Sequence, residues 1–270
     1  MLADDLICDA RNPLPGQVYI SEGSSWSGSV SAPFSEYHSP DDLFVDVDID
    51  YKADDVTVEN FVRVLTGKHL PGEAKKRKLN SHANSNVLVY MAGHGGDNFI
   101  KFQDHEEITT NEISDIFTEM RQFGRFNELL FIVDSCQAFT LCDDLAKVPN
   151  VIGIGSSLKG ENSYAHHTDF TLGVTVVDQF TRELLVFLDK NMTMPGPRDG
   201  TISDFITGID PDVIFAHPGV NDKSSYRKIH QVPMKDFFHS SLISAKAEVT
   251  QEEVHYQDLA EVIARQKSSR

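Results

Sequence analysis

Cysteine is scarce in this chain of 270 residues, which contains three: Cys8, Cys136 and Cys142. So small and odd a number excludes a disulfide framework of the kind that stabilises small secreted domains. The three thiols suit one catalytic cysteine with two bystanders, or one cysteine that is bonded to another chain.

Basic residues are also few, with 24 Lys and Arg against 41 Asp and Glu, and the net charge is −17. Nucleic-acid binding depends on concentrated positive charge, so this composition argues against a nucleic-acid partner. No run approaches the roughly 20 apolar residues of a membrane-spanning helix. The first residues, Met1 to Asp5, lack the basic and apolar regions of a signal peptide. Read alone, the sequence predicts a soluble chain without an export signal.

The length allows one large domain, or one domain followed by a tail. We expect a folded domain over residues 1–240, although residues 1–40 are rich in loop-forming Ser, Gly and Pro. We expect a polar tail over residues 241–270.

Two short apolar runs stand at the centre of the sequence, Val87–Ala92 and Leu129–Val133. A helical stripe lies between them and begins at Thr109, which has capping-box spacing to Glu112. A strand–helix–strand crossover makes the two strands parallel neighbours, so their carboxyl ends lie at the same edge of a sheet. Such edges are where open parallel sheets bind their ligands.

A histidine and a cysteine follow these two strands. The first run is followed by Gly93-His94-Gly95-Gly96 and the second by Asp134-Ser135-Cys136-Gln137, so His94 and Cys136 are 42 positions apart. We expect them to meet at the sheet edge, which is the outline of a cysteine-nucleophile site.

The chemistry of these residue types fits that site. A thiolate is the reactive nucleophile, and a nearby imidazole can take its proton and stabilise it as an ion pair. The N–H groups of Gly95 and Cys136 could stabilise an oxyanion, because glycine lets the backbone approach a substrate closely. Asp134 could orient the site or cap the next turn. The alternative is that His94 ends a strand and Cys136 is a small buried residue.

Further elements follow the periodicity of the sequence. Thr57 predicts a helix start and Gly67 a helix end. Val151–Gly155 reads as a third parallel strand that ends in Ser156-Ser157. Beyond it we expect a long helix from about Thr171 to Lys190, a short helix over Thr201–Thr207, and short strands over Val213–Ala216 and Ile229–Val232.

Acidic residues alternate with apolar ones between Phe44 and Tyr51. Such alternation is more often a solvated strand face than a metal site. Carboxylate and carbonyl oxygens are nevertheless the ligands that Ca²⁺ takes, so calcium is the second interpretation.

Several stretches resemble a known family. YMAGHGG, which contains His94, and FIVDSCQA, which contains Cys136, resemble the His-Gly-Gly and Asp-Thr/Ser-Cys-Gln signatures of legumain-type cysteine peptidases. NFIKFQDHEEIT, GSSLKGENSYAHHTD and VTVENFVRVLTG look like the catalytic subunits of GPI-anchor transamidases within that family. The resemblance runs from about Met1 to His239.

The resemblance implies a caspase-like α/β fold, in which a mostly parallel sheet is flanked by helices. It implies that His94 and Cys136 form a catalytic dyad and that Gly95 contributes to the oxyanion hole. It also implies a lumenal place in the endoplasmic reticulum, in a complex with other transamidase subunits. There, the enzyme cleaves a C-terminal GPI signal through a thioester and passes the acyl group to the ethanolamine amine of the GPI lipid.

Other residues take roles only through this resemblance. Ser156, Ser157, His167 and Asp169 match the region that lines the pocket for the attachment-site residue. Cys8 matches a cysteine that forms an intersubunit disulfide. Asp48, Ile49 and Asp50 fall where relatives bind a structural calcium ion, while the chemistry itself requires no cofactor.

The sequence also departs from the family pattern. Relatives have a signal peptide, a first strand and a first helix before the segment that corresponds to Met1–Asp5, so we expect the sheet to lack that strand and helix. Two alternatives to a transamidase subunit follow. One is a free-standing legumain-like endopeptidase, and the other is a truncated, non-catalytic assembly partner.

Overall fold

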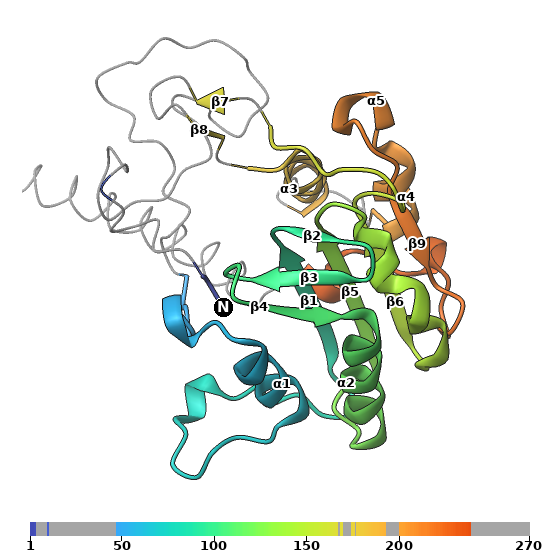
Figure 1. Cartoon of the computed structure of the whole chain (residues 1–270). Coiled ribbons are helices and arrows are strands. Elements are labelled where there is room, and N and C mark those ends of the chain that lie inside the picture. The colour runs from blue at the N-terminus through green and yellow to red at the C-terminus, as the bar shows by residue number, and fades with distance from the viewer. Residues whose placement is uncertain are drawn as a thin grey trace, which may run out of the picture.

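The centre of the molecule is a four-stranded sheet with strand order β1-β5-β6-β9 (Figure 1). This computed structural model describes residues 1–3, 10, 47–166, 168–169, 174–175, 177–192 and 200–238. β1, β5 and β6 are parallel, and β9 is antiparallel to β6. The mostly parallel α/β fold class is thereby confirmed. The strands are β1 (Asn86–Ala92), β5 (Glu128–Asp134), β6 (Val151–Gly155) and β9 (Gly219–Asn221).

β5 is the most enclosed strand, since all seven of its residues are buried. Leu129, Phe131 and Val133 belong to one hydrophobic core, while Leu130 and Ile132 belong to a second one. The reason is that side chains alternate between the two faces of a strand. Burial on both faces explains why β5 reads as an unbroken apolar run in the sequence. Each of these side chains contributes roughly 1.5–3 kcal/mol of hydrophobic stabilisation.

Helices cover the sheet on both faces (Figure 1). The first core contains buried residues of α1 (Val58–Thr66) and α2 (Thr110–Gln122). The second contains buried residues of α3 (Gln179–Met192) and α4 (Ile202–Gly208). The short helices are η1 (Ala53–Asp55), η2 (Lys75–Arg77), η3 (Ala138–Lys147), α5 (Pro211–Ile214), η4 (Ile229–Gln231) and α6 (Lys235–Phe238).

Two predicted helix starts are confirmed, one before β1 and one after it. The Thr57 side chain accepts a hydrogen bond from Asn60 N (3.1 Å), and Gly67 ends α1 in the left-handed region with φ 77°. Thr109 and Glu112 form the predicted capping box at the start of α2. Local capping chemistry therefore fixes both helices that frame the His94 segment.

A second, smaller sheet follows β1 directly and was not predicted. It consists of β2 (Gly95–Gly96), β3 (Phe99–Phe102) and β4 (Glu106–Thr109), all antiparallel. Its strands are too short for alternation to mark them in the sequence. Another short pair, β7 (Thr168–Asp169) with β8 (Val174–Thr175), precedes α3.

Three sequence-based predictions are wrong. The long helix begins at Gln179 rather than near Thr171, because the β-branched residues before it form β8. The predicted strand Val213–Ala216 is not formed, because its first half belongs to α5, and the start of α5 carries a clear signal. Asp210 accepts a hydrogen bond from Asp212 N (3.0 Å), and Pro211 takes the first helical position. The predicted strand over Ile229–Val232 is the helix η4.

β1 is the edge of the main sheet in the described part of the chain. Its one paired neighbour there is β5, and a cavity of about 980 Å³ lies along it, lined by residues from Val87 to His94 and by Tyr51, Phe61 and Phe102. The predicted tail, residues 241–270, lies outside the described residues.

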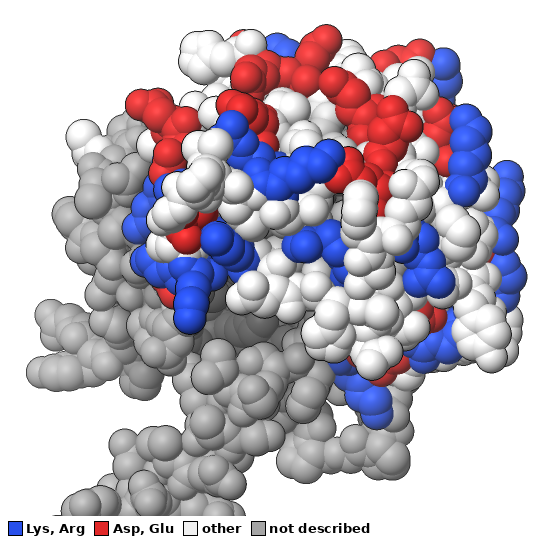
Figure 2. All heavy atoms as spheres, turned by 90° about the horizontal axis from the view of Figure 1, so that it is seen from below, with Lys and Arg blue, Asp and Glu red and all other residues white. Residues whose placement is uncertain are grey.

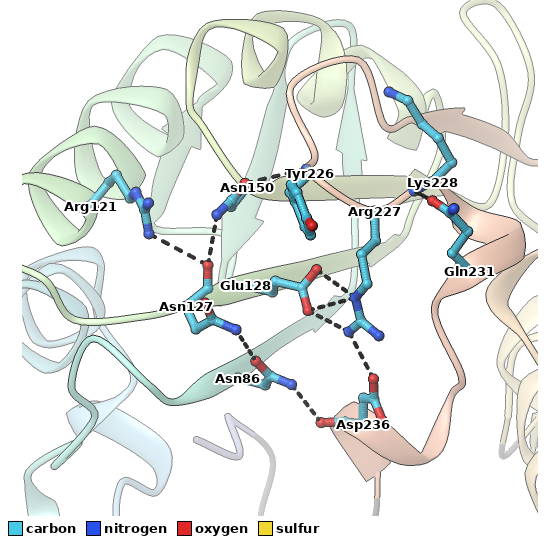
Figure 3. A network of polar contacts seen from close by, with 10 residues as sticks. All are labelled: Asn86, Arg121, Asn127, Glu128, Asn150, Tyr226, Arg227, Lys228, Gln231 and Asp236. Carbon is cyan, nitrogen blue, oxygen red and sulfur yellow. Dashed lines mark hydrogen bonds and ion pairs between the residues drawn. The ribbon is translucent and has the colours of Figure 1, made fainter.

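A polar network lies at the amino-terminal ends of β1 and β5 (Figure 3). Arg227 Nε donates to both carboxylate oxygens of Glu128 (2.9 and 3.1 Å), and Arg227 Nη2 donates to Asp236 Oδ2 (2.7 Å). Asn86 Nδ2 donates to the Asp236 carbonyl oxygen (3.4 Å), and Asn127 Nδ2 donates to Asn86 Oδ1 (3.3 Å). The network therefore fastens the C-terminal segment to the starts of β1 and β5.

Charged side chains of both signs are interspersed over the described part of the face in Figure 2. That distribution is typical of a solvated surface. Among the described helices, none has the length and apolar character that crossing a bilayer requires.

We predict that Arg227→Ala lowers the free energy of unfolding by about 3 kcal/mol, because it leaves the charge of Glu128, 5% exposed, without its bidentate partner. Urea denaturation followed by circular dichroism measures this. The control is Lys147→Ala, which removes an exposed ion pair with Asp144 and should cost at most about 0.5 kcal/mol. Equal losses in the two variants would contradict a structural role for the network.

Candidate active site

The His94 segment leaves the sheet at the carboxyl end of β1. β1 and β5 pair in register from Asn86 with Glu128 to Ala92 with Asp134, and Gly93 N continues the pairing by donating to Asp134 O (3.2 Å). The next residue, His94, is exposed. The parallel register thus places His94 and the residues after Asp134 at one edge, as predicted.

Gly95 brings this segment against the cysteine segment. A Cβ atom on Gly95 would collide with Ser135 Oγ and lie 2.7 Å from Phe99 O, so only glycine fits without displacing the backbone. Lys101 N donates to His94 O (2.8 Å), which makes His94 and Lys101 a hydrogen-bonded pair. In an antiparallel ladder the next pair is of the other type, so Gly95 N–H points away from β3.

The Cys136 segment is held by a loop that follows β6, residues 156–163, which we call the cradle loop. Each neighbouring backbone N–H donates to it: Ser135 N to Ser156 Oγ (3.2 Å), Gln137 N to Glu161 O (2.9 Å), Ala138 N to Ser157 Oγ (3.1 Å) and Phe139 N to Ser157 O (2.9 Å). Cys136 N–H is the exception, since it makes no hydrogen bond within the described residues. A polar N–H left unpaired beside a thiol is what an oxyanion hole requires.

The two candidate oxyanion donors therefore belong to neighbouring segments that meet at the Ser135 side chain. Gly95 packs on Ser135, which directly precedes Cys136. Gly95 N–H points away from β3, and Cys136 N–H makes no hydrogen bond within the described residues. This arrangement can bind a negative oxygen without first breaking a protein hydrogen bond.

The thiols differ sharply in accessibility. Cys136 is partly exposed, whereas Cys142 is fully buried, and burial raises the pKa of the Cys142 thiol. A buried neutral thiol is inert, so Cys136 is the better nucleophile. No hydrogen bond joins His94 to Cys136 among the described contacts, and catalytic pairs often tighten only when substrate binds. The dyad stays a prediction.

Asp134 caps a distant helix. It is 1% exposed, and its Oδ2 accepts from Thr181 N (3.1 Å) and Thr181 Oγ1 (2.6 Å) in the first turn of α3. Its Oδ1 accepts from Ser163 Oγ (2.6 Å) in the cradle loop. The predicted cap of the next turn is not formed, because Asp134 caps α3 instead. The same carboxylate also anchors the far end of the cradle loop.

Asp178 was missed by the sequence reasoning. Burial, together with the negative charge of Asp134, raises the pKa of Asp178 to about 6, and the nearby His94 acts in the opposite direction. The Tyr90 hydroxyl bonds Thr181 Oγ1 in the same cluster, and burial raises the pKa of Tyr90. The sequence does not indicate that Asp178 lies near Asp134 and Tyr90. These residues come together only when α3 packs against β1 and β5.

The predicted pocket residues have different outcomes. Ser156 and Ser157 are buried, and their hydroxyls bond the backbone around Cys136. Asp169 lies in β7, while His167 and Cys8 lie outside the described residues. Their assignment to a substrate pocket and an intersubunit disulfide stays a prediction.

The residues predicted to bind calcium differ in their surroundings. Asp50 Oδ1 is buried without a hydrogen-bond partner, which suits a metal ligand, but Asp48 is exposed. Within the described residues, no group of three or more His, Cys, Asp or Glu side chains could hold a metal ion. Asp48, Ile49 and Asp50 therefore do not complete a site among the described residues, and their role with calcium stays a prediction.

Comparisons with known proteins point to one family. Residues 1–195 match the model of the Peptidase C13 family. A Drosophila melanogaster relative is 43% identical over 238 residues, which are 88% of this chain and 62% of that protein. The GPI-anchor transamidase of Saccharomyces cerevisiae is 39% identical over 242 residues, 88% of this chain and 54% of its own length.

The match extends to mammals. The GPI-anchor transamidase of Mus musculus is 37% identical over 264 residues, 97% of this chain and 61% of that protein. The chain thus spans between 54% and 62% of the length of these three relatives. Among solved structures, caspase-1 from Spodoptera frugiperda has 14% identity and a TM-score of 0.39, covering 60% of this chain and 66% of that one.

We predict that Asp178→Asn stabilises the protein at pH 8 by about 2 kcal/mol and has little effect near pH 4. The folded-state pKa of Asp178 is raised, so its contribution is fully present below the unfolded pKa of 3.8 and is lost as pH rises through about 6. Urea denaturation at several pH values measures this.

The control for this experiment is Asp115→Asn on the exposed face of α2. It should show no comparable difference between pH 4 and pH 8. A stabilisation by Asp178→Asn that does not vary with pH would show that the carboxylate charge is not the cause.

Proposed function

Because this chain belongs to the peptidase C13 family, we propose that it is the catalytic subunit of a GPI-anchor transamidase. The observation that carries the proposal is the identity of 37–43% to relatives over at least 88% of the chain. The site geometry supports it, since His94 and the partly exposed Cys136 lie at the ends of paired strands.

The proposed reaction has two halves. In the first, Cys136 gives its proton to His94, and the thiolate attacks the carbonyl carbon of the attachment-site residue in a C-terminal GPI signal. The N–H groups of Gly95 and Cys136 stabilise the oxyanion. The scissile C–N bond then breaks, the leaving amine takes the proton from His94, and a thioester to Cys136 remains.

In the second half, the ethanolamine amine of the GPI lipid attacks the thioester. His94 takes a proton from that amine, the C–S bond breaks, and an amide joins the protein to the lipid while Cys136 is regenerated. We place this reaction on the lumenal side of the endoplasmic reticulum membrane, in a complex with other transamidase subunits. Ser156, Ser157, His167 and Asp169 are the proposed pocket residues, and Cys8 is the proposed link to a partner subunit.

A free-standing endopeptidase is the second candidate, because the family model describes peptidases. It would use the same nucleophile, with water in place of the amine. A non-catalytic assembly partner is the third, favoured by the cavity along the edge of β1.

We predict that the chain, assayed in its complex, converts a GPI-signal peptide and hydrazine into a peptide hydrazide. Cys136→Ala and His94→Ala should each lower the rate by at least about a thousandfold, because each removes one member of the proposed dyad. Mass spectrometry of the products measures this. Cys142→Ala is the matched control and should retain activity, since that thiol is buried.

The three candidates give different results in this assay. Hydrolysis without hydrazide would identify an endopeptidase. Rescue of transamidase-deficient cells by the chain but not by Cys136→Ala would eliminate the non-catalytic partner. Turnover that survives in either dyad variant would overturn the assignment of the nucleophile or its base.

A further inference from the structure

The cradle loop contains one carboxylate that gathers three hydrogen bonds. Glu161 Oε2 accepts from Leu158 N (2.9 Å) and from His217 N (2.9 Å), and Glu161 Oε1 pairs with His217 Nδ1 (2.7 Å). Leu158 belongs to the same loop, whereas His217 lies 56 positions further along the chain, just after α5. Glu161 thus closes the cradle loop on itself and fastens it to the C-terminal half of the fold.

The same residue is tied to the nucleophile segment through Gln137. Gln137 N donates to Glu161 O (2.9 Å), and Gly160 N donates back to Gln137 Oε1 (3.0 Å). Gln137 has φ 54°, a left-handed conformation that is uncommon for a residue with a side chain. Such a conformation persists only where surrounding contacts enforce it. The two bonds from residues 160 and 161 are contacts of that kind.

The electrostatics favour a charged Glu161. Burial alone would raise the pKa of this carboxyl, but the hydrogen bonds from His217 and Leu158 N–H outweigh it and lower the pKa. Lys159 of the same loop pairs instead with Asp97 (2.7 Å). His217 is therefore the titratable partner that contacts the Glu161 carboxylate among the described residues.

We propose that Glu161, held by His217, is a positioning residue that fixes the Cys136–Gln137 peptide so that Cys136 N–H remains free to stabilise the oxyanion. The inference rests on the proposed cysteine chemistry and adds two residues to it. Neither residue touches the reacting atoms. Their effect passes through the Gln137 N–H, which fixes the Cys136–Gln137 peptide. That peptide is joined at the Cys136 Cα atom to the Ser135–Cys136 peptide, which carries the Cys136 N–H, so fixing one plane restrains the other.

The variant Glu161→Gln distinguishes a role of the carboxylate charge and hydrogen bonds from a role of side-chain volume alone. In Glu161→Gln, the amide oxygen can still accept the two backbone N–H groups, and the amide NH₂ can donate to neutral His217 Nδ1. Protonated His217 carries a donor on Nδ1 and would face another donor. The carboxamide should therefore replace Glu161 at high pH and fail at low pH, whereas Glu161→Ala fails at both.

The test uses the full chain in its complex, with two readouts. The first is hydrogen exchange of the peptides that cover residues 135–139 and 156–163, followed by mass spectrometry. The second is kcat and KM for hydrazide formation. We expect Glu161→Ala to speed exchange in both peptides at least tenfold, with exchange in β5 and the thermal midpoint almost unchanged. We expect kcat to fall about tenfold or more and KM to change less than threefold.

The conservative variants sharpen the result. Glu161→Gln should match the parent protein at pH 8 in exchange and in kcat, and should fall to the level of Glu161→Ala at pH 5.5, with each value expressed relative to the parent at the same pH. His217→Ala keeps its backbone N–H bond and should lie between the parent and Glu161→Ala.

Three results would overturn the proposal. One is unchanged exchange in residues 135–139, another is a loss of kcat with an equal loss of thermal stability, and the third is a Glu161→Gln effect that does not depend on pH. Failure of the proposed function is distinguishable, because hydrogen exchange reports on the cradle loop even where the parent forms no hydrazide.

Discussion

The parallel pairing of β1 with β5 is the constraint on which the rest of the structure depends. It aligns Ala92 with Asp134, so the residues that follow both strands emerge on the same side of the sheet. The burial of β5 on both faces holds this register, because a shift by one residue would exchange the side chains of the two cores. His94 and Cys136 owe their common location to this pairing rather than to any direct bond between them.

The backbone N–H groups around Cys136 differ in their hydrogen bonding. The N–H groups of Ser135 and of Gln137 to Phe139 all donate to the cradle loop, and the N–H of Cys136 does not. The N–H group of an oxyanion hole must be held in place and yet make no hydrogen bond within the protein. Buried backbone N–H groups normally do make such bonds, so the two requirements conflict. The cradle loop meets both by bonding the neighbours of that N–H group.

Local signals in the sequence predicted the parts of the fold that local chemistry decides. Thr57 and Thr109 start helices because their side chains cap them, and Val151–Gly155 is a strand because it is apolar and bounded by polar residues. The start of α3 was misplaced because its cap, Asp134, comes from a strand 47 positions earlier. Glu161 was likewise hidden, since its partners Gln137 and His217 are distant in the sequence. The sheet edge that carries His94 and Cys136 was predictable from the sequence, and the contacts that surround it were not.

Two carboxylates near the candidate site, Asp134 and Asp178, differ in how well their negative charges are stabilised. Asp134 is compensated by three hydrogen bonds, so its charge is tolerated although it is buried. Asp178 lies near that charge and titrates at about 6, which makes its ionised form costly to the fold at neutral pH. The nearby His94 acts in the opposite direction and lowers the pKa of Asp178, so the balance between burial and neighbouring charges decides how much the ionised carboxylate weakens the fold.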